Sequence, residues 1–311
     1  MIYITGDIHG NKRRLYEIKY FCEQNHTTLN DYLIVLGDVG INYYKDIRDS
    51  ILKNIIAELP ITFVCIRGNH ELRLTDVSTY KEKEMFGDIV YQENEYPNII
   101  FLKDGGEYEI NGMEFLAIGG AYSVDKDYRL LNGWNWFSNE QLSLDERNEI
   151  SKKVNGKKYN YVLTHTCPFE WQPTELFLPS IDQNKVDNSM EISLGELERT
   201  ITYDKWYFGH FHGNKNMGKY EMLFEKIKPI DMYIDNNPFI DRIEKEKTTD
   251  GKEFYTVKEV ANYFRISQGT VRNWIKKNYI DSTKLKSGRY VISYDNLEKF
   301  VREHYHYANN K

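Results

Sequence analysis

Five strand-like apolar runs in the chain each end in a short polar cluster, and four of these clusters contain glycine. The clusters are Gly6-Asp7-Ile8-His9-Gly10, Gly37-Asp38-Val39-Gly40, Gly68-Asn69-His70-Glu71, Thr164-His165-Thr166 and Gly209-His210-Phe211-His212. Ligands of open α/β sheets collect at the carboxyl ends of the strands, and glycine lets the backbone pass close to a bound ion. A single His after a strand is usually a solvated loop residue. Five such clusters after five strands instead indicate one shared metal site.

Apolar runs of strand length alternate with helix-period segments from residue 1 to about residue 230. The expected strands are Ile2–Thr5, Tyr32–Leu36, Ile61–Ile66, Ile99–Leu102, Glu114–Ile118, Tyr159–Thr164 and Lys205–Phe208. The expected helices are Lys12–Gln24, Ile47–Leu59 and Leu142–Val154. Ser138 followed by Gln141 reads as a capping box for the third helix, which could equally start a few residues later. Strands that alternate with helices predict a layered α/β core.

The polar clusters contain seven candidate metal ligands, too many for one ion and about right for two ions that share a bridging carboxylate. They are Asp7, His9, Asp38, Asn69, His165, His210 and His212. Mixed imidazole, carboxylate and amide donors suit Mn, Fe, Zn or Ni better than Ca or a thiolate-bound zinc. Two such ions about 4 Å apart can hold a bridging hydroxide and clamp phosphoryl oxygens during in-line displacement.

The ordered motifs GDIHG, GDVG, GNHE, THTCP and GHFH make the chain resemble the calcineurin-like metallophosphoesterases. The resemblance implies a four-layer α/β/β/α sandwich over residues 1–234. It implies that Asp7, His9, Asp38 and His212 hold a first divalent ion and that Asp38 bridges to a second, completed by Asn69, His165 and His210. His70 would lie near the leaving oxygen as general acid or transition-state stabiliser. Mn is the first expectation for the metal, with Fe, Zn or Ni as alternatives.

Departures from the family pattern indicate which class of substrate is favoured. No Arg follows Gly37-Asp38 before Arg48, which weakens a phosphoprotein-phosphatase interpretation because that branch carries a phosphate-binding guanidinium there. Arg67 and Arg73 flank the third motif, and either would replace the missing phosphate-binding guanidinium only in part. The G-H-x-H ending favours the nuclease, phosphodiesterase and small-phosphatase branches.

Two further stretches are candidates for substrate contact. These stretches are Gly119–Arg129 and Gly133–Phe137. Within them, Lys126 and Arg129 are candidate ligands of a non-scissile phosphate. Tyr122, Trp134 and Trp136 are candidates for stacking on a base. The alternative is a Gly-Gly turn, a solvated lysine and tryptophans that pack the rim of the sandwich. The long span 169–196 is either a lid that sets specificity or an exposed excursion.

The C-terminal part differs in charge from the rest of the chain. Residues 251–311 contain twelve Lys and Arg against six Asp and Glu, a net charge of +6, and residues 1–250 have 29 against 41, a net charge of −12. A polar stretch at 235–252 reads as the linker before a third segment, 253–311. Thr256 and Ser267 are expected to cap two short helices, Ser287-Gly288 to turn a hairpin, and Ser293 to cap a last helix.

Residues 254–306 resemble the small winged helix-turn-helix modules of the excisionase and MerR type, through YTVKEVANYF, SQGTVRNWIKK and KSGRYVI. The resemblance implies a DNA-binding module whose second helix enters the major groove. The candidate DNA contacts are Gln268, Thr270, Arg272, Asn273, Lys276 and Arg289. The alternative is a helical module for dimerisation or docking.

These observations predict a dimetal phosphohydrolase, a phosphatase or phosphodiesterase that uses a metal-bridging hydroxide on a nucleotide or small phosphoester and is tethered to a DNA-binding module. The net negative charge of residues 1–250 disfavours a long polyanionic substrate. A DNA-directed metallo-nuclease is the first alternative, and a non-catalytic, ligand-sensing DNA-binding regulator is the second. No apolar run reaches the ~18 residues of a membrane helix, and no signal segment or disulfide framework is seen, so we expect a cytoplasmic protein with no membrane partner.

Overall fold

The computed structural model describes residues 1–230, 253–264 and 266–304. The chain divides into two compact units, Met1–Pro229 and Ile230–Lys311. The linker expected at 235–252 lies outside the described residues. Among the described residues, no helix has both the length and the apolar character needed to cross a membrane.

The first unit contains two mixed sheets. The first has the strand order β13-β1-β2-β3-β6-β5-β4. Its strands are β1 (Ile2–Thr5), β2 (Tyr32–Val35), β3 (Thr62–Cys65), β4 (Lys81–Met85), β5 (Asp88–Gln92), β6 (Ile99–Leu102) and β13 (Lys228–Pro229). The second has the order β11-β12-β10-β9-β8-β7. Its strands are β7 (Gly106–Ile110), β8 (Met113–Ile118), β9 (Lys158–Thr164), β10 (Thr202–Phe208), β11 (Lys215–Met217) and β12 (Tyr220–Met222).

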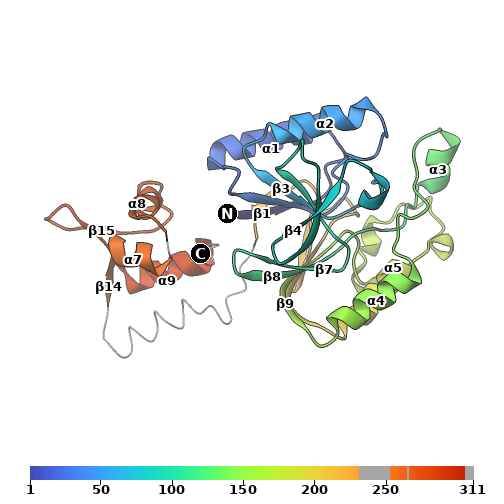
Figure 1. Cartoon of the computed structure of the whole chain (residues 1–311). Helices are drawn as coiled ribbons and strands as arrows, with labels where there is room; N and C mark the ends of the chain where they lie inside the picture. The colour runs from blue at the N-terminus through green and yellow to red at the C-terminus, as the bar shows by residue number, and fades with distance from the viewer. Residues whose placement is uncertain (231–252, 265, 305–311) are drawn as a thin grey trace. The chain divides into compact units, whose positions relative to one another are not determined.

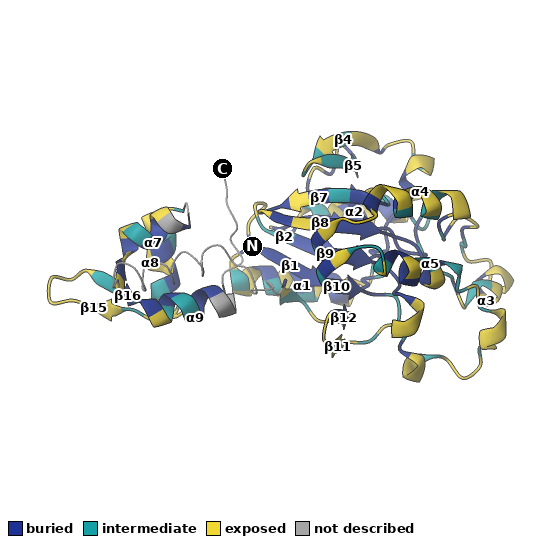
Figure 2. Cartoon of the chain, turned by 90° about the horizontal axis from the view of Figure 1, so that it is seen from below, coloured by how far each residue is buried: buried dark blue, intermediate teal, exposed yellow. Residues whose placement is uncertain are grey.

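Helices cover the outer face of each sheet (Figure 1). Helices α1 (Lys12–Asn25) and α2 (Ile47–Ala57) pack on the first sheet, with Leu15 and Ile56 in one buried cluster with Phe63 of β3. Helices α4 (Leu144–Val154) and α5 (Ser189–Glu198) pack on the second sheet. The strand residues that point away from the helices are buried as well, because the two sheets pack against each other through these faces. Figure 2 shows the inner strands β1, β2, β9 and β10 as mostly buried, and the edge strand β4 and the outer surfaces of the helices as exposed.

The four-layer α/β/β/α sandwich expected for the first unit is confirmed, and so are its seven predicted strands. The unpredicted strands include all four sheet edges, β13, β4, β11 and β7. Edge strands are short and polar, as in the sequence KEKEM of β4, so they lack the apolar run of an inner strand.

The helix starts were predicted in part. The capping box at Ser138 was wrong: Ser143 caps α4, its hydroxyl accepts from the Glu146 N–H and the Glu146 carboxylate accepts from the Ser143 N–H. Gln141 instead donates to Asp187. No helix was predicted in the stretch Gly119–Arg129 or in the long span 169–196, yet α3 (Lys126–Leu131) begins in the first and α5 begins in the second. Three 3₁₀ turns precede α5, at Phe169–Trp171, Thr174–Leu176 and Gln183–Lys185.

The second unit has three helices among its described residues and a three-stranded antiparallel sheet of order β14-β16-β15. The elements are β14 (Phe254–Thr256), α7 (Val257–Tyr263), α8 (Gln268–Lys276), β15 (Thr283–Lys284), β16 (Tyr290–Ser293) and α9 (Tyr294–His304). The predicted caps are confirmed, because Thr256, Ser267 and Ser293 accept backbone N–H groups at the three helix starts. A core around Val260, Trp274 and Leu297 holds the helices together.

Candidate metal centre and adjoining pocket

The five loops that carry the candidate ligands meet at one place. Strands β1, β2 and β3 are parallel in the first sheet, and β9 and β10 are parallel in the second. Their carboxyl ends lie at the same edge of the sandwich, so the residues that follow them converge. Asp7, Asp38, Asn69 and His165 are buried, whereas His212 is exposed and leaves the cluster open to solvent on its side.

The donor atoms form two overlapping groups. In the first, His9 Nε2 is 2.9 Å from His212 Nε2 and 3.7 Å from Asp7 Oδ2, and His212 Nε2 is 3.4 Å from Asp7 Oδ2. In the second, His165 Nε2 is 3.6 Å from Asp38 Oδ2 and 2.8 Å from Asn69 Oδ1. Asp38 Oδ2 also faces His9 Nδ1 at 3.8 Å, so this carboxylate joins the two groups. Donors held about 2.1 Å from one ion lie roughly 3 to 3.5 Å apart, which fits this spacing.

His210 lies beside the second group. Its ring centroid is 5.0 Å from that of His165, and its backbone N–H donates to Asp7 Oδ1 at 3.0 Å. The other carboxylate oxygen, Asp7 Oδ2, is buried and accepts no hydrogen bond from the described residues. A buried carboxylate oxygen without a donor is costly unless a cation neutralises it.

Neighbouring groups set the orientation of two candidate ligands. His165 Nδ1 is 2.7 Å from the Leu36 carbonyl oxygen, which only accepts, so Nδ1 carries the proton and Nε2 is free to bind a metal. Asn69 Nδ2 donates to Ser123 Oγ at 2.8 Å, which turns Oδ1 toward the cluster. Ser123 in turn donates through Oγ and its backbone N–H to the Glu140 carboxylate. Neither Ser123 nor Glu140 was among the predicted site residues: Ser123 lies in the stretch Gly119–Arg129 but was not one of the candidates there, and Glu140 belongs to no motif.

The backbone of the cluster is strained at several candidate ligands. His9, Asp38, His210 and His212 have φ values of 54°, 48°, 65° and 51°. Non-glycine residues pay roughly 1–2 kcal/mol for this left-handed region, and such strain concentrates at functional sites. Glycine also makes room for the carboxylates: a Cβ on Gly68 would lie 1.9 Å from Asp38 Oδ1, and one on Gly209 would lie 2.4 Å from Asp7 Oδ1.

The carboxylates and imidazoles shift each other's protonation. Burial alone would raise the pKa of Asp7 and Asp38, but the facing imidazoles outweigh it and hold both pKa values below the usual range. Burial would lower the pKa of His165, yet Asp38 raises it to about 9. Burial and the charge of His165 lower the pKa of His210 to about 3. The cluster therefore attracts positive charge, and a metal that displaces the His165 proton would bind in a pH-dependent way.

Glu71 connects two of the ligand loops. Its buried carboxylate accepts the backbone N–H groups of Val39 at 2.8 Å, Gly40 at 3.3 Å and Gly68 at 2.9 Å. These donors belong to the loops after β2 and β3, which carry Asp38 and Asn69. Glu71 is therefore placed to hold the two loops at a fixed separation.

We expect Glu71→Ala to destabilise the fold by about 3 kcal/mol or more, because it leaves three backbone N–H groups without their acceptor. The measurement is urea unfolding of the full chain followed by tryptophan fluorescence. Glu84→Ala, which truncates an exposed glutamate of β4, serves as the control and should change the midpoint little. Equal midpoints for the two variants would contradict the role given to Glu71.

His70 lies at the edge of the cluster, with Nε2 3.9 Å from Asp38 Oδ2. Arg129 Nη2 contacts its ring nitrogens, and the Tyr43 ring stacks on it with centroids 6.3 Å apart. Arg129 is itself buried and held by Asp125 at 2.9 Å. Burial, with the charge of Arg129 acting in the same direction, lowers the pKa of His70 to about 4 although Asp38 opposes it.

The structure does not bring the other candidate substrate cations to the cluster. Arg67 is buried, donates to the Glu140 carbonyl at 2.8 Å and faces Asp104. Arg73 pairs with Glu146 at 2.6 Å. Lys126 lies over the Trp136 ring at 4.1 Å. Arg67 and Arg73 thus support the loop after β3, and Arg129 alone of the four reaches a residue of the cluster.

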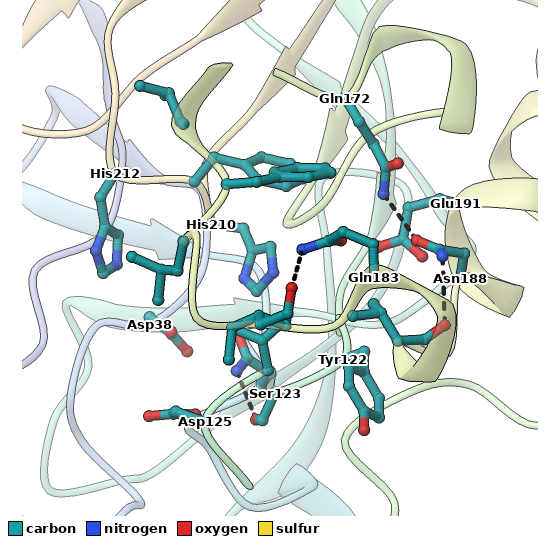
Figure 3. A pocket seen from close by; sticks show the side chains of 18 of the residues that line it. Asp38, Tyr122, Ser123, Asp125, Gln172, Gln183, Asn188, Glu191, His210 and His212 are labelled. Carbon is teal, nitrogen blue, oxygen red and sulfur yellow. Dashed lines mark hydrogen bonds between the residues drawn. The ribbon is translucent and has the colours of Figure 1, made fainter. Parts of the chain in front are cut away.

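A pocket of about 410 Å³ adjoins the metal cluster (Figure 3). Asp38, Asn69, His70, His210 and His212 line its metal end. The 3₁₀ turns between β9 and α5 supply another wall, and residues 122–125 supply a third. Residues of the span 169–196 therefore line the pocket, and much of the same span is exposed, so the lid and the exposed excursion both stay predictions.

The candidate DNA contacts lie in the second unit. Gln268, Arg272, Asn273 and Lys276 are exposed on α8, and Arg289 is exposed in the turn before β16. Thr270 is half-buried and its hydroxyl is 3.0 Å from Ser267 Oγ. Val271 and Trp274 point into the core, so α8 presents the polar residues on its free face.

Comparisons with known proteins give two family matches. A model of the calcineurin-like phosphoesterases matches residues 1–214, and a model of a helix-turn-helix domain matches residues 254–305. No curated protein matches the chain. A crystal structure of TT1561 of Thermus thermophilus is 11% identical in sequence, covers 73% of this chain and 96% of its own, and has a TM-score of 0.42.

Proposed function

The chain belongs to the calcineurin-like phosphoesterase family, and we propose that its residues 1–234 form a dimetal phosphohydrolase and its residues 253–311 a DNA-binding module. The observation that supports the first part is the convergence of Asp7, His9, Asp38, His165 and His212 around two buried carboxylates, with Asn69 and His210 beside His165. The substrate we propose is a nucleotide or another small phosphoester.

The residues present fit a pair of divalent ions. Asp7, His9, Asp38 and His212 would hold one, and Asn69, His165 and His210 would complete the other with Asp38 shared. The buried Asp7 Oδ2, which faces the His9 and His212 imidazoles at 3.7 and 3.4 Å, and the 2.9 Å approach of those two rings both support this assignment. The nitrogen- and oxygen-rich donor set fits Mn, our first choice, or Fe, Zn or Ni. The ions would supply Lewis acidity toward the phosphoryl oxygens and an activated water.

His70 is the residue we assign to the leaving group. It lies beside Asp38 and lines the pocket at its metal end, where the ester oxygen of a bound substrate would lie. Tyr43 and Arg129 fix the ring in place, so little rotamer freedom is lost when a substrate binds. A hydrogen bond from His70 would stabilise the negative charge that develops on the departing oxygen.

The experiment that tests this proposal compares substrates on the full chain with Mn²⁺ at low salt. It uses an aryl phosphomonoester, a bis-aryl phosphodiester, a cyclic nucleotide and a labelled DNA duplex. We expect turnover of a small phosphoester with the duplex intact. Cleavage of the duplex at a comparable rate would favour a DNA-directed nuclease, and no turnover of any substrate would favour a ligand-sensing regulator.

Replacing Arg272 with alanine is expected to weaken DNA binding about tenfold, because its guanidinium lies on the free face of α8. Fluorescence anisotropy with labelled duplexes at several salt concentrations measures both the affinity and the salt slope. Lys258→Ala, which removes an exposed positive charge on α7, is the matched control. Equal losses in the two variants would show that α8 has no special part in binding.

A further inference from the structure

The pocket beside the metal cluster has mostly apolar walls. Leu176, Phe177, Ile181 and Val186 line it from the segment between β9 and α5. The Phe177 ring stacks on Phe211, which follows His210 directly, with centroids 6.2 Å apart and planes at 23°. Its volume of about 410 Å³ is within the usual range for a small-molecule site. Such walls suit a flat, apolar ring system.

The described residues that line the pocket include no Lys or Arg. Its charged members outside the metal ligands are Asp125 and Glu191, both acidic. A second phosphate placed here would meet no Lys or Arg among the lining residues, and because Asp125 is already paired with Arg129, Glu191 is the acidic group that it would face. The lining therefore favours an organic part that is uncharged or positively charged over a polyphosphate or a long nucleic acid.

Glu191 of α5 gives the pocket a specific hydrogen-bond acceptor. The side chain is buried, and Oε1 accepts from the Thr166 hydroxyl at 2.7 Å. The other oxygen, Oε2, is buried and has no hydrogen-bond partner among the described residues. Burial raises the pKa of Glu191 to about 7, although the Thr166 hydroxyl opposes the rise. A donor from a ligand would supply the missing partner.

Carboxamides lie close to Glu191 in the same part of the pocket. Gln172 Nε2 donates to Asn188 Oδ1 at 3.0 Å, and Asn188 Nδ2 is directed to the Val186 carbonyl. Figure 3 shows Gln172, Gln183, Asn188 and Glu191 grouped on the side away from His212 and Asp38. The pocket thus runs from phosphoryl-binding groups at one end to hydrogen-bonding groups at the other, with apolar walls between them.

We propose that this pocket binds the base of a nucleoside monophosphate and that Glu191 accepts a hydrogen bond from an exocyclic amino group on it. The ring would pack against the apolar walls while the single phosphate meets the metal cluster. Only the placement of the phosphate at the metal cluster rests on the proposed function. Base recognition follows from the pocket itself and can be measured without catalysis.

Binding of uncharged nucleosides to the full chain tests this proposal by isothermal titration calorimetry. Adenosine and purine riboside differ by one amino group, so this pair isolates the donor that Glu191 would accept. We expect adenosine to bind at least about tenfold more tightly. Glu191→Gln places an amide donor in the pocket and should reduce that preference at least about fivefold, whereas Glu196→Gln, on the exposed face of α5, should preserve it.

Equal binding of adenosine and purine riboside, or no nucleoside binding at millimolar concentration, would overturn the base assignment. The wild-type comparison decides this even if a variant fails to fold. Nucleoside binding in a protein that hydrolyses no phosphoester would leave the pocket assignment standing and remove the proposed function. Hydrolysis of a phosphoester without selectivity between the two nucleosides would leave the proposed function standing and remove the pocket assignment.

Discussion

Asp38→Asn is expected to lower kcat/KM for a small phosphoester about a thousandfold or more, equivalent to about 4 kcal/mol of transition-state stabilisation. The Asp38 carboxylate faces His9 at 3.8 Å, His165 at 3.6 Å and His70 at 3.9 Å, so it is shared by both groups of donors. Asparagine keeps the shape but removes the negative charge that two cations would share. The measurement is hydrolysis of an aryl phosphomonoester at saturating Mn²⁺, together with the metal content of the purified variant.

Asp145→Asn is the matched control for this variant, because Asp145 is exposed in the first turn of α4. It should keep both activity and metal content. Activity of Asp38→Asn within tenfold of the wild type would contradict the assignment of Asp38 as a shared ligand.

His70→Asn is expected to lower kcat about a hundredfold while the metal content stays unchanged. The side chain lines the pocket but is not needed to complete either group of ligands, so its loss should affect the leaving group rather than metal binding. An aryl phosphate with a good leaving group should be less affected than an alkyl phosphate, because its departing oxygen needs less stabilisation.

The control for His70 is His26→Asn, an exposed residue that follows α1. It should leave both kcat and the dependence on leaving group unchanged. Loss of metal from His70→Asn would instead identify His70 as a ligand, an outcome that its closeness to His9 and Asp38 allows. Equal losses for the aryl and alkyl substrates would contradict a role at the leaving oxygen.

Much of the fold and the candidate metal centre could be predicted because both depend on local sequence. The inner strands are continuous apolar runs, and each ligand lies within four residues of the end of one of them, as Asp38 follows β2 and His210 follows β10. Parallel pairing then brings the ligands to one edge without further information. In the second unit, the helix starts at Thr256 and Ser267 were likewise predicted from local sequence, whereas the helix-turn-helix assignment came from the resemblance of YTVKEVANYF, SQGTVRNWIKK and KSGRYVI to that family.

What could not be predicted depends on contacts between distant residues. Ser123 and Glu140 orient Asn69, the Leu36 carbonyl orients His165, and Glu71 spans two loops, yet none of these pairings leaves a periodic signal. Arg129 illustrates the same limit. As a cation near the rim it was a candidate phosphate ligand, whereas the folded chain buries it against His70.

A titration of Mn²⁺ into the full chain after chelation, with aryl phosphomonoester hydrolysis followed throughout, tests whether the cluster is a dimetal catalytic site. We expect no turnover in the metal-free protein, activity that rises and saturates with Mn²⁺, and about two ions bound per chain at saturation. Full turnover in the chelated protein, or saturation with Mn²⁺ without any hydrolysis, would show that the cluster is not such a site.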